Sequence, residues 1–181
     1  MPAPSHPLTL ALESADEGDF EALLALRLAA MRDGLERLGR FDPALARERL
    51  GRSFSPPNTR HIVSNGQRVG FVALTFGESL WRLDHLYVHP MFQHQGIGTW
   101  VLEQVLARAD AERCAVALTI VRRTEAFRFW QKHRFKLVDE NDWDQYFLRP
   151  VQPAIPAPGP AAPSGPAQGP GASSASPPSK A

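Results

Sequence analysis

A turn with two glycines lies where a strand pattern gives way to a helix pattern. The segment Gln93-His94-Gln95-Gly96-Ile97-Gly98 follows a strand candidate over Leu80–Val88 and precedes a helix candidate over 99–111. Glycine has no Cβ, so the backbone at this turn can bend sharply and approach a ligand closely. The first amides of a helix also lack intrahelical partners and lie at the positive end of the helix dipole. The pattern therefore predicts a site for an anion such as a pyrophosphate.

Two nucleotide-binding motifs that use similar turns are excluded. The chain has no GxxxxGK[ST] segment, so it has no P-loop. The dinucleotide fingerprint fails as well, because its third glycine would have to stand at Val101. An ordinary strand-to-helix connection that binds nothing remains the alternative for this turn on its own.

A second motif lies downstream and completes a family pattern. The spacing Ala126-x-x-Phe129-Trp130-x-x-x-Arg134-Phe135 resembles A-x-x-F/L-Y-x-x-x-G-F, and residues 93–98 satisfy Q/R-x-x-G-x-G/A. Both are signatures of the GNAT acetyltransferase superfamily, which the chain resembles over about residues 8–149. The resemblance implies an α/β fold of the GNAT type, with a central mixed, mostly antiparallel sheet and helices on both faces.

The resemblance also implies acetyl-coenzyme A as co-substrate. In the family it binds in a V-shaped gap between two strands, here 80–88 and 114–121. One backbone N–H near Leu86–Val88 would polarise the thioester carbonyl, and the amides from 94 to 99 would hold the pyrophosphate. The coenzyme-binding residues that we expect are Leu86, Tyr87, Val88, Gln93, His94, Gln95, Gly96, Ile97, Gly98, Thr99, Arg123 and Trp130.

The family reaction is direct attack by an amine, with no covalent enzyme intermediate. The amine must lose a proton, either to a base or along a water path. Asp84 lies near the position where several relatives place a catalytic carboxylate, and it is the first candidate, acting through water. Its alternative roles are an ion pair with Arg82 or the orientation of a cationic acceptor. His85 is the second candidate because histidine titrates near neutral pH, and its alternative role is packing beside a helix.

Side chains alternate along a strand, which sorts these candidates onto two faces. Arg82, Asp84, Leu86 and Val88 are predicted to share one face, with His85 and Tyr87 on the other face.

The chain departs from the second motif of the family at three positions. Many relatives have tyrosine where Trp130 stands, asparagine where Arg123 stands and glycine where Arg134 stands. That tyrosine usually protonates the coenzyme thiolate, which indole cannot do. We therefore expect Trp130 to form a hydrophobic wall beside the thioester, with packing into the core as the alternative. Arg123 could contact coenzyme phosphates or lie in a solvated basic loop.

The elements that must position these residues alternate along the chain. The capping-box spacing of Ser14 and Glu17 predicts a first helix, Asp42-Pro43 a second, and Asn65-Gly66 a hairpin. A nearly continuous apolar run predicts a central strand at 114–121 that is buried on both sides. The expected strands are 8–12, 60–63, 69–76, 80–88, 114–121, 135–138 and 145–148, and the expected helices 15–32, 42–54, 99–111 and 124–133.

Composition sets the domain organisation and excludes several classes of protein. Of 181 residues 43% are apolar, and the formal net charge is +1. We expect one domain over 1–150 and a disordered tail rich in Pro, Ala, Gly and Ser over 151–181. The near-zero charge argues against nucleic-acid binding, and a single cysteine excludes a disulfide framework. With no apolar run or leader sequence long enough for a membrane, we expect a cytoplasmic protein.

These observations favour an N-acetyltransferase that acts on a primary amine of a small molecule or peptide. A non-catalytic acyl-coenzyme A-binding module with a partner-recruiting tail is the main alternative, and a passive scaffold is the third. The mixed charges from Arg27 to Asp42 fit helix surface, although Glu36 or Asp42 could receive a cationic amine. No metal is expected, and a homodimer is one arrangement that we consider.

Overall fold

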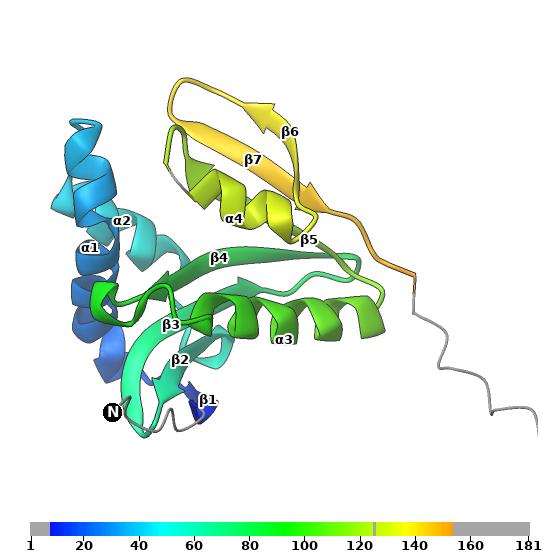
Figure 1. The fold of residues 1–181 in the computed structure, drawn as a ribbon, viewed down its shortest axis with the longest axis horizontal. Coiled ribbons are helices and arrows are strands. Elements are labelled where there is room, and N and C mark those ends of the chain that lie inside the picture. Colours follow the sequence, from blue (N-terminus) through cyan, green and yellow to red (C-terminus); the bar gives the residue numbers. More distant parts are fainter. Residues whose placement is uncertain (1–7, 125, 154–181) are drawn as a thin grey trace, which may run out of the picture.

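The computed structural model describes residues 8–124 and 126–153 (Figure 1). The strands are β1 (Leu10–Ser14), β2 (Thr59–Ser64), β3 (Gln67–Thr75), β4 (Leu80–Val88), β5 (Ala115–Val121), β6 (Lys136–Glu140) and β7 (Asp144–Arg149). The helices are α1 (Phe20–Arg37), α2 (Pro43–Ser53), α3 (Ile97–Ala111) and α4 (Ala126–Lys132), with short 3₁₀ turns η1 (Glu17–Asp19), η2 (Pro56–Asn58) and η3 (Pro90–Phe92). The order of strands and helices confirms the expectation from the sequence.

Local signals explain most element boundaries. Asp42 caps α2 by accepting a hydrogen bond from the Leu45 amide, with Pro43 in the first turn. Asn65 and Gly66 both adopt positive φ in the two-residue turn between β2 and β3. The predicted capping box at Ser14 is wrong by two residues. Asp16 and Asp19 form it instead, because Ser14 still belongs to β1, where it pairs with Arg60.

All seven strands form one sheet in the order β1-β2-β3-β4-β5-β7-β6. Only the central pair, β4 and β5, runs parallel, and every other pair is antiparallel. The mixed, mostly antiparallel sheet confirms the predicted fold class. The parallel pair lies next to α3, the helix that connects its two strands (Figure 1).

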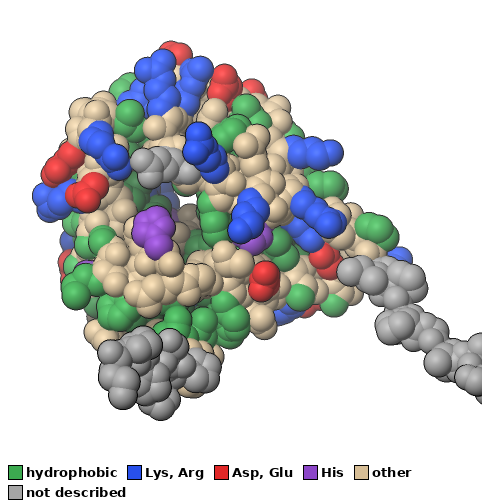
Figure 2. Space-filling model, in the orientation of Figure 1, with side chains coloured by type: hydrophobic (Ala, Val, Ile, Leu, Met, Phe, Trp, Pro, Cys, Tyr) green, Lys and Arg blue, Asp and Glu red, His purple; other side chains and the backbone are tan. Residues whose placement is uncertain are grey.

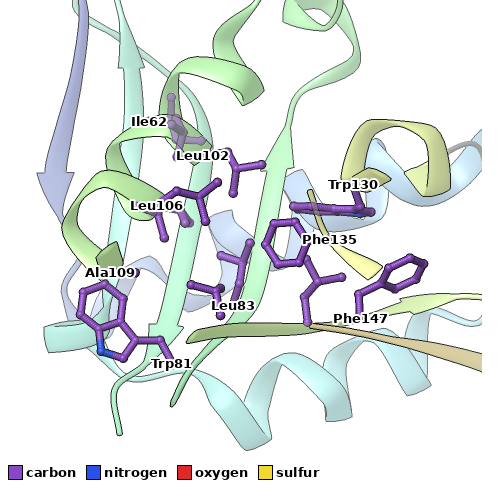
Figure 3. Packing of buried hydrophobic residues seen from close by; sticks show 14 of the residues in the cluster. Ile62, Trp81, Leu83, Leu102, Leu106, Ala109, Trp130, Phe135 and Phe147 are labelled. Atoms are coloured by element: carbon purple, nitrogen blue, oxygen red, sulfur yellow. The ribbon is translucent and has the colours of Figure 1, made fainter. Parts of the chain in front are cut away.

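Helices cover both faces of this sheet, and β3 shows how the residues divide between them. Phe71 packs with Leu23 and Leu24 of α1 and Leu50 of α2. Its neighbour Val72 points the other way, into a larger core beneath α3 and α4. Figure 3 shows part of this larger core, in which the labelled residues are Ile62, Trp81, Leu83, Leu102, Leu106, Ala109, Trp130, Phe135 and Phe147.

The predicted burial of β5 on both sides is wrong. On one face of β5, Val116 and Leu118 are buried in the larger core. On the opposite face Thr119 is exposed. Helices α1 and α2 do not extend across this part of the sheet as a packed layer, and a cavity borders it instead. The strand is nevertheless central, since it pairs with β4 on one edge and β7 on the other.

The described chain continues past the last strand. The Gln152 amide donates to Asp110 at 3.1 Å, and Asp110 also forms a two-pronged ion pair with the buried Arg149. Most of the tail predicted over 151–181 lies outside the described residues, so its boundary stays a prediction. Among the described helices, none has the length and hydropathy needed to cross a bilayer.

Candidate active site

The two parallel strands at the centre of the sheet separate along their length. Strands β4 and β5 pair over four residues only, Leu80–Leu83 of β4 with Ala115–Leu118 of β5. Beyond Leu83 the outer edge of β4 remains paired with β3 as far as Val88, and β5 remains paired with β7. The facing edges therefore have no strand partner among the described residues. Their backbone amides and carbonyls can pair with an extended chain that carries amide groups.

Three adjoining cavities occupy this gap and its two ends. The gap cavity, about 300 Å³, is bordered by β4, β5, α1, α2 and α4. A cavity of about 470 Å³ continues to Gln93 and His94 beside α3, and one of about 660 Å³ continues under the α1–α2 connection. Met31 and Val121 border all three. Figure 2 shows the molecule hollowed here, with an opening between the α1 side and the α4 side.

A β-bulge in β4 changes which residues face the gap. The register with β3 shifts between Ala73, which pairs with His85, and Leu74, which pairs with Leu83, so Asp84 is the extra residue. The predicted alternation is therefore wrong across this point. Leu86 and Val88 pack toward α3 with Leu83, whereas Arg82 and Asp84 lie on the other side of the sheet.

Asp84, the first candidate base, lies in the wall of the gap cavity and is held by two partners. Its carboxylate forms an ion pair with the Arg82 guanidinium and accepts a 2.6 Å hydrogen bond from the Thr75 hydroxyl. Its side chain is only 8% exposed. The structure thus contains the ion pair that was its alternative role, and also places the carboxylate where it can exchange a proton with the cavity.

His85, the second candidate, is buried in the same wall. One ring nitrogen, Nε2, lies 2.7 Å from the Ser53 hydroxyl, and Nδ1 has no hydrogen-bond partner among the described residues. Burial, followed by the charges of Arg27 and Arg82, lowers the pKa of His85 to about 3. The expectation that it titrates near neutral pH therefore does not hold, and the imidazole is neutral at pH 7.

The glycine turn before α3 has an open, unusual backbone. Gly96 is the N-cap of α3 with φ +79°, and no side chain caps this helix end. A Cβ at Gly96 would meet open space, which is the condition for close approach of a ligand. His94 also has a positive φ, 61°. The cavity that reaches His94 therefore lies beside the turn that leads into α3, the helix end whose first amides lack intrahelical partners.

Other residues of the turn fix its position. The Gln93 side chain donates to the Val88 carbonyl at 2.9 Å, and Gln95 donates to the Met91 carbonyl at 3.3 Å. Ile97 is buried in the larger core and anchors the start of α3 there. A Cβ at Gly98 would lie 3.7 Å from the Phe129 ring of α4, an ordinary van der Waals contact, so the packing of α3 on α4 does not require glycine here.

Comparison with known proteins gives the family. Residues 57–137 match the family model for the acetyltransferase (GNAT) domain. The chain contains a GNAT domain. This stretch extends from β2 to β6 and so includes the gap, the glycine turn and α3. No curated protein matches the chain.

Solved structures share the fold of this GNAT domain at low sequence identity. It is similar to PaiA N-acetyltransferase from Thermoplasma acidophilum in complex with coenzyme A, with TM-score 0.62 and 16% identity, over 78% of this chain and 99% of that one. Ard1 from Thermoplasma volcanium is similar with TM-score 0.60 and 18% identity, over 80% of this chain and 99% of that one. The ribosomal-protein-S18-alanine N-acetyltransferase from Escherichia coli is similar with TM-score 0.60 and 14% identity, over 81% of this chain and 96% of that one.

Trp130 of the GNAT domain is both a core residue and a cavity wall. It is 7% exposed and makes edge contacts with Phe129 and Phe135, at ring-centroid distances of 4.9 and 5.5 Å. Figure 3 shows it next to Phe135 in the larger core. It also borders the gap cavity beside Ala126. The two roles expected for this residue are therefore compatible, since different parts of the side chain can serve each.

The other two departures from the family motif share a backbone feature. Arg123 has φ +66° and Arg134 has φ +67°, a left-handed conformation that asparagine and glycine adopt more easily than arginine. Arg134 donates to Gln152 at 2.9 Å on the surface. Arg123 is exposed and has no partner among the described residues. The family residues at these positions thus suit the turn, independently of any chemistry.

Sequence reasoning missed four residues that border the cavities of the GNAT domain. They are Arg27, Arg49, Ser53 and Asp144. For Arg27 the sequence contained a signal, because it lies three and four residues after Leu24 and Leu23 in the apolar stripe of α1. The other three are brought to the site only by the packing of α2 and β7 around the gap.

Proposed function

We propose that this GNAT domain transfers an acetyl group from acetyl-coenzyme A to a primary amine by direct attack. The observation that carries the proposal is the continuous path from the glycine turn, through the β4–β5 gap, to the cavity under α1 and α2. Two substrates can enter such a path from opposite ends and meet between the strands. The coenzyme seen in the PaiA complex and the family match support this choice.

The residues of the gap fit coenzyme A in two separate ways. On its gap side the backbone of β4 from Leu86 to Val88 has no strand partner and could pair with the amides of the pantetheine arm, with the Val88 carbonyl also accepting from Gln93. The uncapped first turn of α3, with Gly96 open to solvent, suits a pyrophosphate. When bound, the coenzyme would supply an acetyl group activated as a thioester. A backbone N–H of β4 would stabilise the oxyanion that forms on its carbonyl.

The attacking amine must give up a proton, and Asp84 is the group that we assign to receive it through water. Its carboxylate lies in the cavity wall and forms an ion pair with Arg82. The other candidate, His85, has a pKa of about 3 and is a weak base for this purpose. Its role is to present a neutral polar edge to the gap. On the side of the gap where the coenzyme thiolate leaves, Trp130 excludes water without donating a proton.

The coenzyme site is tested by Gly96→Leu, with Gly66→Leu as its matched control. Both glycines have similar positive φ, 79° and 80°, and both would place a Cβ in open space. The two variants should therefore lose similar stability, but only Gly96→Leu should weaken acetyl-coenzyme A binding by calorimetry. Equal affinity in wild type and Gly96→Leu, with native circular dichroism, would remove the coenzyme from this site.

Catalysis is tested separately by thiol release from acetyl-coenzyme A in the presence of an amine panel. Release that depends on both the enzyme and an amine supports transfer. Tight coenzyme binding with no release from any amine would support the alternative, a non-catalytic acyl-coenzyme A-binding module. The ion pair of Asp84 and the tryptophan at position 130 are the two observations that keep this alternative in view.

A further inference from the structure

Arg27 is a buried cation without an anionic partner. It lies in α1, is only 4% exposed, and its Nη1 has no hydrogen-bond partner among the described residues. Its Nε donates to the sulfur of Met31 at 3.4 Å, and its guanidinium carbon lies 5.5 Å from the centre of the Tyr87 ring. No carboxylate of the described residues forms an ion pair with it.

These contacts leave most of the charge of Arg27 uncompensated. A thioether is a weak acceptor, and an aromatic ring attracts a cation without accepting its hydrogen bonds in the way that a carboxylate does. Buried charges are normally paired, because removing an ion from water is costly. An arginine in this state is suited to an anion that arrives with a ligand.

The position of Arg27 tells where that anion would bind. It borders both the gap cavity and the larger cavity under the α1–α2 connection. It therefore lies where an amine in the gap would connect to the rest of an acceptor molecule. His85 and Tyr87 of β4 lie close by, so the anion would be next to the reacting centre.

Counted with Arg27, the charged groups that line the larger cavity have a positive excess, because three arginines face two carboxylates. Its two carboxylates are already engaged, because Asp42 caps α2 and Asp144 forms an ion pair with Arg49 at 3.5 Å. Arg40 lies over the Trp143 ring at 4.8 Å, and its Nη1 also lacks a partner among the described residues. The remaining lining is largely apolar, with Leu35, Leu38, Phe41, Leu45 and Trp143 among its members.

We propose that the acceptor is an amino acid or a similar small amine whose carboxylate binds Arg27, with its amine in the β4–β5 gap and an apolar side chain under α1 and α2. This inference rests on the proposed acetyl transfer. In that reaction the amine nitrogen forms a bond to the thioester carbonyl carbon, and the carbon–sulfur bond breaks. The amine proton leaves toward water and Asp84, and the thiolate later takes a proton from solvent.

The first test compares matched acceptors. Leucine, methionine and phenylalanine are each assayed beside their carboxamide and their decarboxylated amine, together with an N-terminally free peptide that has no acidic residue. The carboxylates should give kcat/KM values about 10- to 100-fold above their neutral analogues, the range for one hydrogen-bonded charge. Equal rates within each set would overturn the inference, and selective turnover of the peptide would point to a protein acceptor instead.

The second test uses Arg27→Met, with Arg52→Met as control on the exposed surface of α2. Arg27→Met should abolish the preference for carboxylates and should not lower the melting temperature, because it removes an unpaired buried charge. Arg52→Met should retain the preference. A lower melting temperature with the preference intact would show that Arg27 only supports the fold.

The two proposals can fail independently. If every acceptor is acetylated equally well with or without a carboxylate, the proposed acetyl transfer is supported and the proposed role of Arg27 is contradicted. If acetyl-coenzyme A binds but no amine releases thiol, the proposed transfer itself falls. Circular dichroism and coenzyme affinity of Arg27→Met, measured beside both assays, establish that the variant retains its fold and its coenzyme site.

Discussion

The Ser53 hydroxyl lies 2.7 Å from Nε2 of His85 and joins α2 to β4 at the wall of the gap. The same hydroxyl lies 3.1 Å from the Arg49 carbonyl, to which it can donate its single proton. Nε2 of the neutral ring then donates to Ser53, and Nδ1 remains a bare acceptor. The contact therefore fixes both the orientation and the tautomer of a buried, uncharged histidine.

This histidine should make the fold sensitive to mild acid. Its pKa falls from 6.5 to about 3 on folding, so the unfolded chain binds a proton that the folded chain does not. The contribution of His85 to the free energy of unfolding is complete above pH 6.5. It is lost as the pH falls toward 3, at up to about 1.4 kcal/mol per pH unit. Urea unfolding of wild type and His85→Gln between pH 7 and 4.5 measures this slope.

The variant should show a smaller slope than the wild type over that range. The glutamine amide can still donate to Ser53 but does not titrate. His133, whose pKa is also lowered by burial, contributes a loss of the same sign in both proteins. The lowered pKa values of Asp19 and Asp110 act only in stronger acid. Equal slopes in the two proteins would contradict the assignment of a buried neutral His85.

Asp84→Asn tests the proton path. If Asp84 receives the amine proton through water, the variant should lose about a hundredfold or more in kcat. Coenzyme affinity should change little, because asparagine can retain the hydrogen bond from Thr75. Steady-state kinetics and calorimetry on the same preparation give both quantities. A near-normal kcat at neutral pH would leave Asp84 as a structural partner of Arg82 alone.

The sequence predicted the elements and failed where tertiary structure overrides local pattern. Caps and turn residues such as Asp42 and Asn65 act within a few residues, so their consequences could be read directly. The bulge at Asp84 depends on how β3 and β4 pair, and no residue in the strand predicts it. It reversed the predicted faces of Leu86 and Val88. The separation of β4 and β5 came only from the family resemblance.

Arg27 shows the opposite kind of failure, in which a visible signal was misinterpreted. A charge inside the apolar stripe of α1 was assigned to the helix surface because arginine is usually exposed. Burial of an arginine needs a reason that the sequence alone does not provide, namely the Tyr87 ring and the cavities beneath α1. The site residues contributed by α2 and β7 were invisible for the same reason.

Gly70→Ala should displace the end of β4 at the proposed coenzyme site. A Cβ at Gly70 would overlap the carbonyl oxygen of Tyr87 and press on the Ile62 side chain. Overpacking of this kind costs about 1–3 kcal/mol, and the shift should also weaken acetyl-coenzyme A binding. Gly51→Ala in α2 is the control, since its Cβ meets nothing within 4 Å. It should gain about 0.5–1 kcal/mol with no change in affinity.

Both quantities come from urea titration and calorimetry of the two alanine variants. Gly70→Ala with wild-type stability and affinity would show that β3 can move away from Tyr87 without disturbing the gap.

Trp130 variants separate its two contacts. Trp130→Tyr should keep coenzyme affinity and preserve or raise kcat, because it restores a phenolic hydroxyl near the leaving thiolate. Trp130→Phe provides the ring without the hydroxyl and should not show that gain. Trp130→Ala should cost about 3–5 kcal/mol of stability through the lost contact with Phe135 and should weaken binding. If Trp130→Ala loses stability but keeps full affinity, the residue serves the core alone.

Arg134→Gly should stabilise the protein without altering its kinetics. The arginine holds a φ of +67°, which costs a residue with a Cβ about 1–2 kcal/mol. Glycine removes this strain but raises the entropy of the unfolded chain, so the net gain should be about 0.5–1 kcal/mol. Arg123→Asn, at φ +66°, should give a smaller gain for the same reason. A rise in the urea midpoint with unchanged kcat and coenzyme affinity would show that the family residues at these positions serve the turn. A large change in kcat with either variant would instead place that arginine in contact with a substrate.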